Sequence, residues 1–196
     1  MATPKPKAVE RTPVVILFAE TRGFTRTSAM LQPQVVIARV SEFFTVVQKA
    51  VEQHGGTVRN VLNDTLAASF AGKGHAQKAV EAAQHIQDSF ESIEEAWQAQ
   101  YGIRASVAVG LHAGEVIIAD GPIPGQPLFI GDSVSITERL LHRARAGEVI
   151  LSKPVMDALA ETGFRLDAKP LPDLEIPRRD PIPLFGLVRD TRLDFT

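Results

Sequence analysis

The sequence has 196 residues, 44% hydrophobic and 22% charged, with a formal net charge of −2. This length suits one well-buried domain, and the interspersed charges exclude the basic footprint of a nucleic-acid-binding protein or a polybasic membrane patch. The chain has no cysteine, which excludes disulfides and thiolate metal sites and is typical of a reducing cytoplasm. No apolar run reaches the roughly 20 residues of a membrane span, so we expect a cytoplasmic protein with no nucleic-acid or membrane partner.

The first residues combine a polar lead-in with a buried strand. Residues 1–12 contain two prolines and no apolar periodicity, which predicts a disordered lead-in. We expect one domain over 13–190 and a tail at 191–196. The apolar run Val14–Phe18 predicts a strand that delivers Glu20 to its carboxyl end.

The next segments predict a turn, a helix and a hairpin. Gly23 permits a tight turn whose amides can point at an anion. Apolar residues between Val36 and Val51 recur at spacings of three and four, which predicts a long helix that ends near His54 before two glycines. Strands are expected at Thr57–Leu62 and Leu66–Ala71, with Asp64 at the tip of the turn between them.

The second half alternates helices and strands and includes a loop at 120–127. His112, Ala113 and Gly114 are predicted to form a turn between two strands. Helices are expected at 75–100, 132–144 and 154–161. Strands are expected at 103–111, 115–119, 128–130, 148–151, 164–168 and 182–188.

This order of elements predicts an α+β fold, an α/β sandwich with the helices gathered on one face of a sheet. The arrangement is a ferredoxin-like βαββαβ core with additional C-terminal strands and helices. Unrelated functions use this architecture, so the fold alone does not indicate the activity.

Several stretches, in order and at compatible spacing, resemble the class III adenylyl and guanylyl cyclase catalytic domain, also called the cyclase homology domain. The resemblance covers Pro13 to about Val188. Its motifs are Leu17–Thr25, His54–Thr57, Asn63–Asp64, Val109–Glu115, Ile130–Asp132, Arg139 and Gly147–Leu151.

The resemblance implies a lyase of cyclic-nucleotide signalling. Such domains form a homodimer, or a heterodimer with another cyclase domain, and hold active sites at the interface. ATP or GTP is cyclised there to the 3′,5′-monophosphate with loss of pyrophosphate. Two Mg²⁺ or Mn²⁺ ions bridge two aspartates and lower the pKa of the ribose 3′-hydroxyl.

At the metal and phosphate positions, the resemblance is only partly kept. Glu20 stands at the first metal position, where the family has aspartate, and Asp64 stands at the second. Thr21 falls where a backbone carbonyl is the ligand. The phosphate loop corresponds to Gly23, Phe24 and Thr25.

Base recognition and transition-state positions are altered more strongly. Asn60 falls at the purine-reading lysine, and Leu128 falls at its polar partner. An apolar Leu128 leaves a buried polar edge of the base unpaired, at a cost of about 1 to 3 kcal/mol. Ser135 falls at the ribose-orienting asparagine, and Arg139 matches the transition-state arginine.

These departures favour a degenerate cyclase with weak or no turnover. The alternative is a non-catalytic pseudo-cyclase that dimerises and binds a nucleotide or an active partner. A third possibility is a dimerisation scaffold without a ligand, which the anion-ready turn at Gly23 disfavours. For His112 we expect no general-base role, because the resemblance places no catalytic histidine there.

Overall fold

The protein is described by a computed structural model that covers residues 11–24, 28–122 and 127–188. The first ten residues of the expected lead-in, the tail at 191–196 and Thr25 lie outside these ranges. The elements are β1 (Arg11–Arg22), α2 (Pro33–Gln53), β2 (Thr57–Leu62), β3 (Thr65–Phe70), α3 (His75–Tyr101), β4 (Ser106–Ala119), β5 (Leu128–Ile130), α4 (Asp132–Arg143), β6 (Glu148–Ser152), α5 (Lys153–Glu161), β7 (Lys169–Leu174) and β8 (Ile182–Val188).

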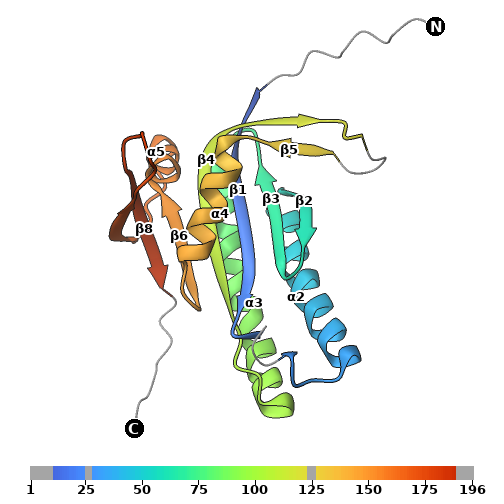
Figure 1. Ribbon diagram of the computed structural model, residues 1–196. Coiled ribbons are helices and arrows are strands. Elements are labelled where there is room, and N and C mark those ends of the chain that lie inside the picture. Colours follow the sequence, from blue (N-terminus) through green and yellow to red (C-terminus); the bar gives the residue numbers. More distant parts are fainter. Residues whose placement is uncertain (1–10, 25–27, 123–126, 189–196) are drawn as a thin grey trace, which may run out of the picture.

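Among the described residues, eight strands form one mixed sheet (Figure 1). The strand order is β2-β3-β1-β4-β6-β8-β7, and β5 pairs only with the outer end of β4. This arrangement confirms the predicted α+β class. β1 begins at Arg11, two residues before the expected domain start at Pro13.

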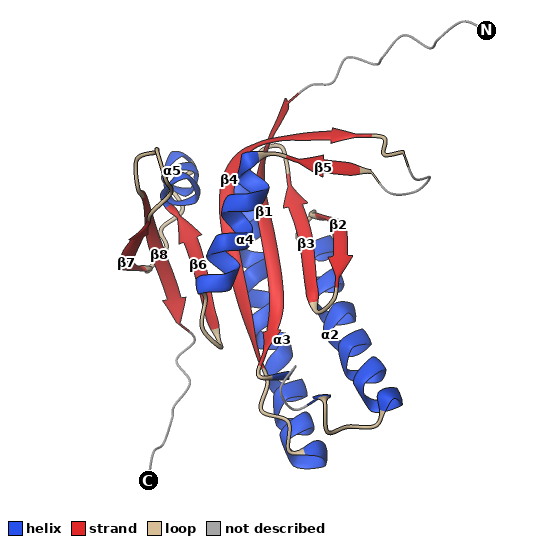
Figure 2. Ribbon diagram, viewed as in Figure 1, coloured by secondary structure: helices blue, strands red, loops and turns tan. Residues whose placement is uncertain are grey.

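Helices cover both faces of the sheet, so the prediction that they gather on one face is wrong (Figure 2). α2, α3 and α5 pack on the face that receives Val15 and Leu17, whereas α4 packs on the face that receives Val14 and Ile16. β1 is therefore buried on both sides, which explains its continuous apolar run.

β4 is one continuous strand rather than the predicted strand pair around a turn. It pairs with β1 along its whole inner length, and Ile16 lies opposite His112. Gly114 does not serve a turn, since a Cβ there would lie 2.1 Å from Ser133 Oγ on α4. A close approach of helix to sheet therefore requires this glycine.

The strand expected at 164–168 is displaced toward the C-terminus. β7 instead occupies Lys169–Leu174 and pairs with β8. Phe164, Leu166 and Ala168 do pack against the core under α5, which accounts for their alternating apolar pattern. The alternation thus reflects packing without strand pairing.

The outer end of β4 and the short β5 form a two-stranded arm that extends beyond β1 (Figure 1). The arm projects on the side of the molecule that carries β2 and β3. In the described part of the chain, no helix has the length and apolar character needed to cross a membrane.

Candidate functional site

The candidate site begins with Glu20, near the end of β1. Alternation along the strand places Glu20 on the face that receives Phe18, which is the face covered by α4. Its backbone pairs with Thr65, the first residue of β3. Only 16% of the Glu20 side chain is exposed, so the carboxylate is held at the edge of the core.

Asp64 reaches the same place from the β2–β3 turn. Asn63 adopts a positive φ of 55°, which is typical of asparagine in a tight turn. Because Thr65 pairs with Glu20, the turn brings Asp64 beside the end of β1. Glu20, Asn63 and Asp64 line one pocket of about 380 Å³.

The electrostatics of Glu20 indicate a second negative charge close by. Burial raises the pKa of the Glu20 carboxyl, and the neighbouring charge of Asp64 raises it further. Arg22 lowers this pKa through its charge and a hydrogen bond, and His142 lowers it through charge. Burial dominates, so the protonated carboxyl is favoured more than in a solvated glutamate.

The oxygen donors of this pocket fit a hard divalent cation such as Mg²⁺ or Mn²⁺. The negative charge of Asp64 disfavours the ionised form of Glu20, and a cation between the two carboxylates would relieve that repulsion. Within the described ranges, no three acidic or histidine side chains converge to hold a metal by themselves. Backbone carbonyls, water or phosphate oxygens of a ligand would complete the coordination.

The turn after β1 is constrained by the core. Gly23 has φ +83°, and a Cβ there would lie 2.2 Å from the Arg104 carbonyl oxygen. Phe24 is 3% exposed and packs on Trp97, with 5.5 Å between the ring centroids. Thr21 is buried and does not line the pocket, so its side chain is not a donor there.

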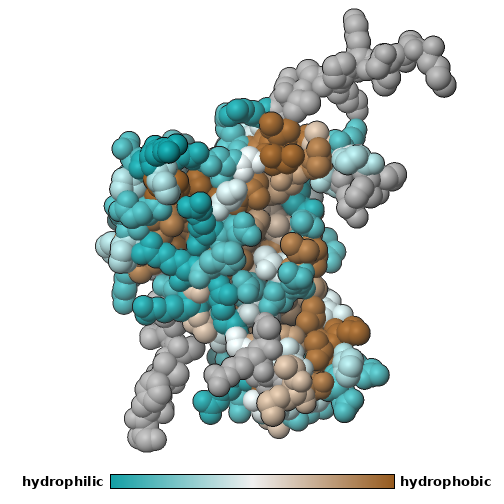
Figure 3. Space-filling model, viewed as in Figure 1, coloured by the Kyte–Doolittle hydropathy of each residue, from teal (hydrophilic) through white to brown (hydrophobic). Residues whose placement is uncertain are grey.

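A larger groove of about 800 Å³ adjoins the acidic pocket. Asn60 lines both, and Leu128 on β5 lines the groove. The apolar surface in Figure 3, coloured brown, runs along this side of the molecule. Its large exposed residues here are Val61, Leu62, Leu128 and Ile130.

Ser135 and Arg139 lie apart from both cavities. They are exposed, one turn apart, on α4. Neither lines the acidic pocket or the groove, so one chain does not bring them to Glu20 and Asp64.

The adjacent stripe of α4 contributes two residues that the sequence reasoning missed. Glu138 and His142 line the acidic pocket. Their i, i+4 spacing with Val134 was a detectable signal, but only the docking of α4 on this face of the sheet assigns the stripe to the site.

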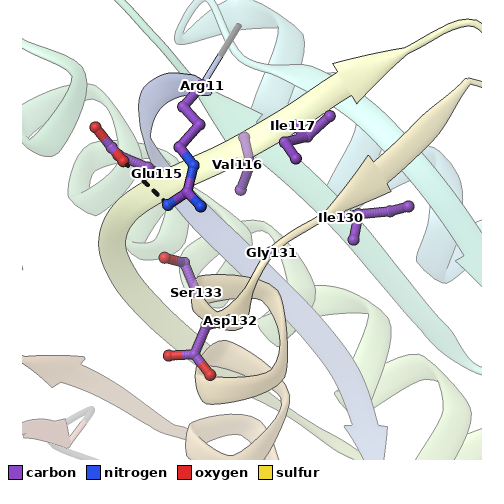
Figure 4. A pocket seen from close by; sticks show the side chains of 8 residues that line it. All are labelled: Arg11, Glu115, Val116, Ile117, Ile130, Gly131, Asp132 and Ser133. Atoms are coloured by element: carbon purple, nitrogen blue, oxygen red, sulfur yellow. Dashed lines mark ion pairs between the residues drawn. The ribbon is translucent and has the colours of Figure 1, made fainter. Parts of the chain in front are cut away.

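A third pocket, of about 330 Å³, lies at the start of α4 and contains none of the predicted site residues. Arg11 forms an ion pair of 3.6 Å with Glu115 at its rim, and Ser133 lies below them (Figure 4). Asp132 turns its carboxylate away from Arg11 and pairs with Arg179. The charged groups around this pocket are therefore satisfied mainly by one another.

The chain is similar in sequence and structure to known proteins. The family model of the adenylate and guanylate cyclase catalytic domain matches residues 7–184. An adenylate cyclase of Anabaena cylindrica is 26% identical over 133 residues, which are 65% of this chain and 26% of that protein. The chain thus spans about a quarter of the length of the curated relatives that it matches.

Two solved structures share the fold. The adenylyl cyclase CyaB from P. aeruginosa superimposes with a TM-score of 0.84 at 18% identity, covering 95% of this chain and 98% of that one. The guanylate cyclase domain of RhGC from Catenaria anguillulae, solved in complex with GTP, gives a TM-score of 0.78 at 17% identity, covering 90% and 97%.

Proposed function

Since this chain belongs to the adenylate and guanylate cyclase catalytic domain family, we propose that it binds a purine nucleoside triphosphate with divalent metal and cyclises it slowly. The convergence of Glu20 and Asp64 in one pocket carries this proposal. Two carboxylates, one near the end of β1 and one in the β2–β3 turn, are the donor set that metal-dependent phosphate chemistry needs.

The two acids of the pocket and the turn after β1 have definite tasks in this proposal. Asp64 and Glu20 would hold Mg²⁺ or Mn²⁺, with the backbone carbonyl of Thr21 as a further donor. When bound, the metal lowers the pKa of the ribose 3′-hydroxyl and neutralises phosphate charge. The backbone at Gly23 would face the phosphates, and it excludes a side chain there, because a Cβ would lie 2.2 Å from the Arg104 carbonyl oxygen.

Slow turnover follows from the altered residues. Glu20 is longer than aspartate by one methylene, and Mg²⁺ demands near-ideal octahedral geometry. Its carboxylate also lies 3.0 Å from the Arg22 guanidinium, which competes with a metal for the same oxygens.

The position of Ser135 and Arg139 supports a site shared between two chains. Both side chains are exposed on α4 and reach neither cavity of their own chain. A second copy of the domain, or another cyclase domain, would present them to a nucleotide held by Glu20 and Asp64. We therefore propose catalysis at a dimer interface.

A second candidate is a regulatory module that holds the nucleotide without turnover. The ion pair between Glu20 and Arg22 and the apolar Leu128 favour it. The two candidates share nucleotide binding and differ in the product.

The test incubates the purified chain with each nucleoside triphosphate and Mn²⁺ and separates the products chromatographically. We expect slow formation of a cyclic monophosphate that the Asp64→Asn variant abolishes. Metal-dependent binding without product supports the regulatory module. No binding to wild-type protein in the presence of Mn²⁺ overturns both.

A further inference from the structure

Two histidines from different helices meet edge to edge where α2 contacts α3. His54 is the residue at which α2 ends, and His85 lies within α3. Their rings are nearly perpendicular, with an interplanar angle of 82° and 5.5 Å between the ring centroids. Nε2 of His54 lies 3.3 Å from Nδ1 of His85. The two nitrogens therefore face one another across the contact between the helices.

The backbone holds both rings in place. The amide of Gly56 donates to the carbonyl of Val51 at 2.8 Å, which closes the end of α2 around His54. His85 precedes Ile86, which is fully buried in the core, so this turn of α3 is fixed against the sheet. The spacing of the two imidazoles is thus set by the packing of one helix on the other.

A carboxylate lies on the far side of the His54 ring. Oε2 of Glu81, one turn before His85 on α3, lies 3.6 Å from Nδ1 of His54. Gln77 donates to the other oxygen of Glu81 at 2.8 Å and so helps to hold the carboxylate in this position. A carboxylate beside Nδ1 favours the tautomer that carries its hydrogen there. Nε2 of His54, which faces His85, then has a free lone pair.

The distance between the two nitrogens matches that of two imidazoles on one zinc ion. Zn²⁺ binds histidine nitrogen at about 2.0–2.1 Å with tetrahedral geometry, so two nitrogens on the same ion are roughly 3.3 to 3.4 Å apart. Hydrogen bonds from N–H to oxygen in proteins are shorter, at about 2.7–3.2 Å. Small rotations of the rings of His54 and His85 would direct both lone pairs at an ion between them.

The histidine pair is accessible to an ion from solvent. The side chain of His54 is 26% exposed and that of Glu81 is 37% exposed. Glu81 stands at the opposite nitrogen of His54, so it orients this ring and does not bind the same ion. This agrees with the finding that, in the part of the chain that the structure describes, no group of three potential ligands converges. Two imidazoles thus bind the ion, and water fills the remaining positions.

We propose that His54 and His85 bind Zn²⁺, with Glu81 as the carboxylate that orients His54. Imidazole nitrogen is a donor that suits Zn²⁺, whereas Mg²⁺ prefers oxygen. This site and the acidic pocket of Glu20 and Asp64 therefore select different ions. The bound zinc joins the end of α2 to α3 and fixes the point from which the chain enters β2. The inference stands independently of the proposed function.

The test titrates Zn²⁺ into protein without an affinity tag and measures binding by calorimetry. We expect one zinc site that both His54→Gln and His85→Gln abolish. Glu81→Gln keeps both ligands and should bind roughly tenfold more weakly, because it removes the carboxylate behind a ligand. His75→Gln is the matched control and should keep the site, since this histidine of α3 contacts the carbonyl of Gly72 instead.

Two further measurements use wild-type protein, so they do not depend on how a variant folds. At about a hundredfold excess of Zn²⁺ over its dissociation constant, the melting temperature should rise by roughly 5 to 10 °C. Cu²⁺ binds imidazole sites more tightly than Zn²⁺ does. Its electron paramagnetic resonance spectrum in this protein should show coupling to two nitrogen nuclei.

The outcomes separate a zinc site from a simple contact between helices. Wild-type protein that binds no Zn²⁺ overturns the inference and leaves His54 and His85 as a hydrogen-bonded pair. A zinc site that survives both histidine substitutions, or Cu²⁺ coupled to fewer than two nitrogens, also overturns it. Loss of the zinc site in Asp64→Asn would place the ion in the acidic pocket instead. Nucleotide plays no part in these measurements, so failure here leaves the proposed function standing.

Discussion

Arg22 Nη1 lies 3.0 Å from Glu20 Oε1, and its other terminal nitrogen donates to the carbonyl of Leu141. The guanidinium is therefore fixed between the end of β1 and α4. In this position it neutralises the carboxylate that a metal would need. In the proposed mechanism, this contact would weaken the metal centre even though both acids are present.

Glu20→Asp should strengthen the metal centre. The shorter side chain withdraws from Arg22 and places its oxygens where the family's aspartate holds them. We expect turnover with Mg²⁺ to rise by about tenfold, as a barrier lower by roughly 1.4 kcal/mol would give. The measurement is the initial rate of cyclic product as Mg²⁺ is varied. Glu20→Gln, which removes the charge, should fall below wild type, and equal rates for all three proteins would contradict the account.

Complementation between inactive variants tests the shared site. Asp64→Asn and Arg139→Ala remove groups that act from different chains in the proposed dimer. Mixing and reassembling the two should restore roughly a quarter of wild-type activity, because half the dimers are mixed and each keeps one intact site. A mixture of Asp64→Asn with Glu20→Ala, which damages the same half-site in both chains, should remain inactive. Restoration in this control would refute the shared arrangement.

Protonation of His112 should lower the free energy of unfolding at acid pH. Burial lowers its pKa from 6.5 to about 4, and its Nδ1 lies 2.8 Å from Ser152 Oγ. In the unfolded chain His112 is protonated below pH 6.5, whereas in the folded chain it stays neutral down to about pH 4. The free energy of unfolding is therefore largest above pH 6.5 and should fall by about 3 kcal/mol toward pH 4.

The pH effect is measured by urea unfolding between pH 4 and pH 7.5. The control is His112→Gln, which cannot titrate and should show a flatter pH profile than wild type. If both proteins have parallel profiles, His112 is not the group responsible.

Gly23→Ala should destabilise the fold by about 2 to 4 kcal/mol, because strain at positive φ adds to a clash with the Arg104 carbonyl. Gly102→Ala is the matched control. It has a similar φ of +67° with nothing within 4 Å, so it should cost only about 1 kcal/mol. Equal losses of unfolding free energy for the two variants in urea would contradict a contribution from the close approach to the Arg104 carbonyl.

The meeting of Glu20 with Asp64 was predictable from sequence, because a buried strand and a tight hairpin both have local signatures. The path of β4 was not. The segment around Gly114 has a turn-like composition. The glycine is required for another reason, because Ser133 on α4, further along the chain, packs closely against it. Glu138 and His142 were missed for the same reason, since local periodicity does not tell which face of a sheet a helix covers.

Arg59 illustrates a further limit. Residue-by-residue comparison with a family pattern assigned the base contact to Asn60 and found no cation. A β-bulge in β2 brings Arg59 into the groove, and it is a property of the β2–β3 register that leaves no mark in composition. The sequence therefore did not indicate that a guanidinium lines the same groove as Asn60.

The most direct test of the central claim is calorimetric titration of GTP and of ATP into the wild-type chain and Asp64→Asn, each with Mn²⁺ and with excess EDTA. The account predicts saturable binding of at least one triphosphate to wild-type protein with Mn²⁺, and none with EDTA or after removal of the Asp64 charge. Binding that survives both changes, or no heat under any condition, would contradict it.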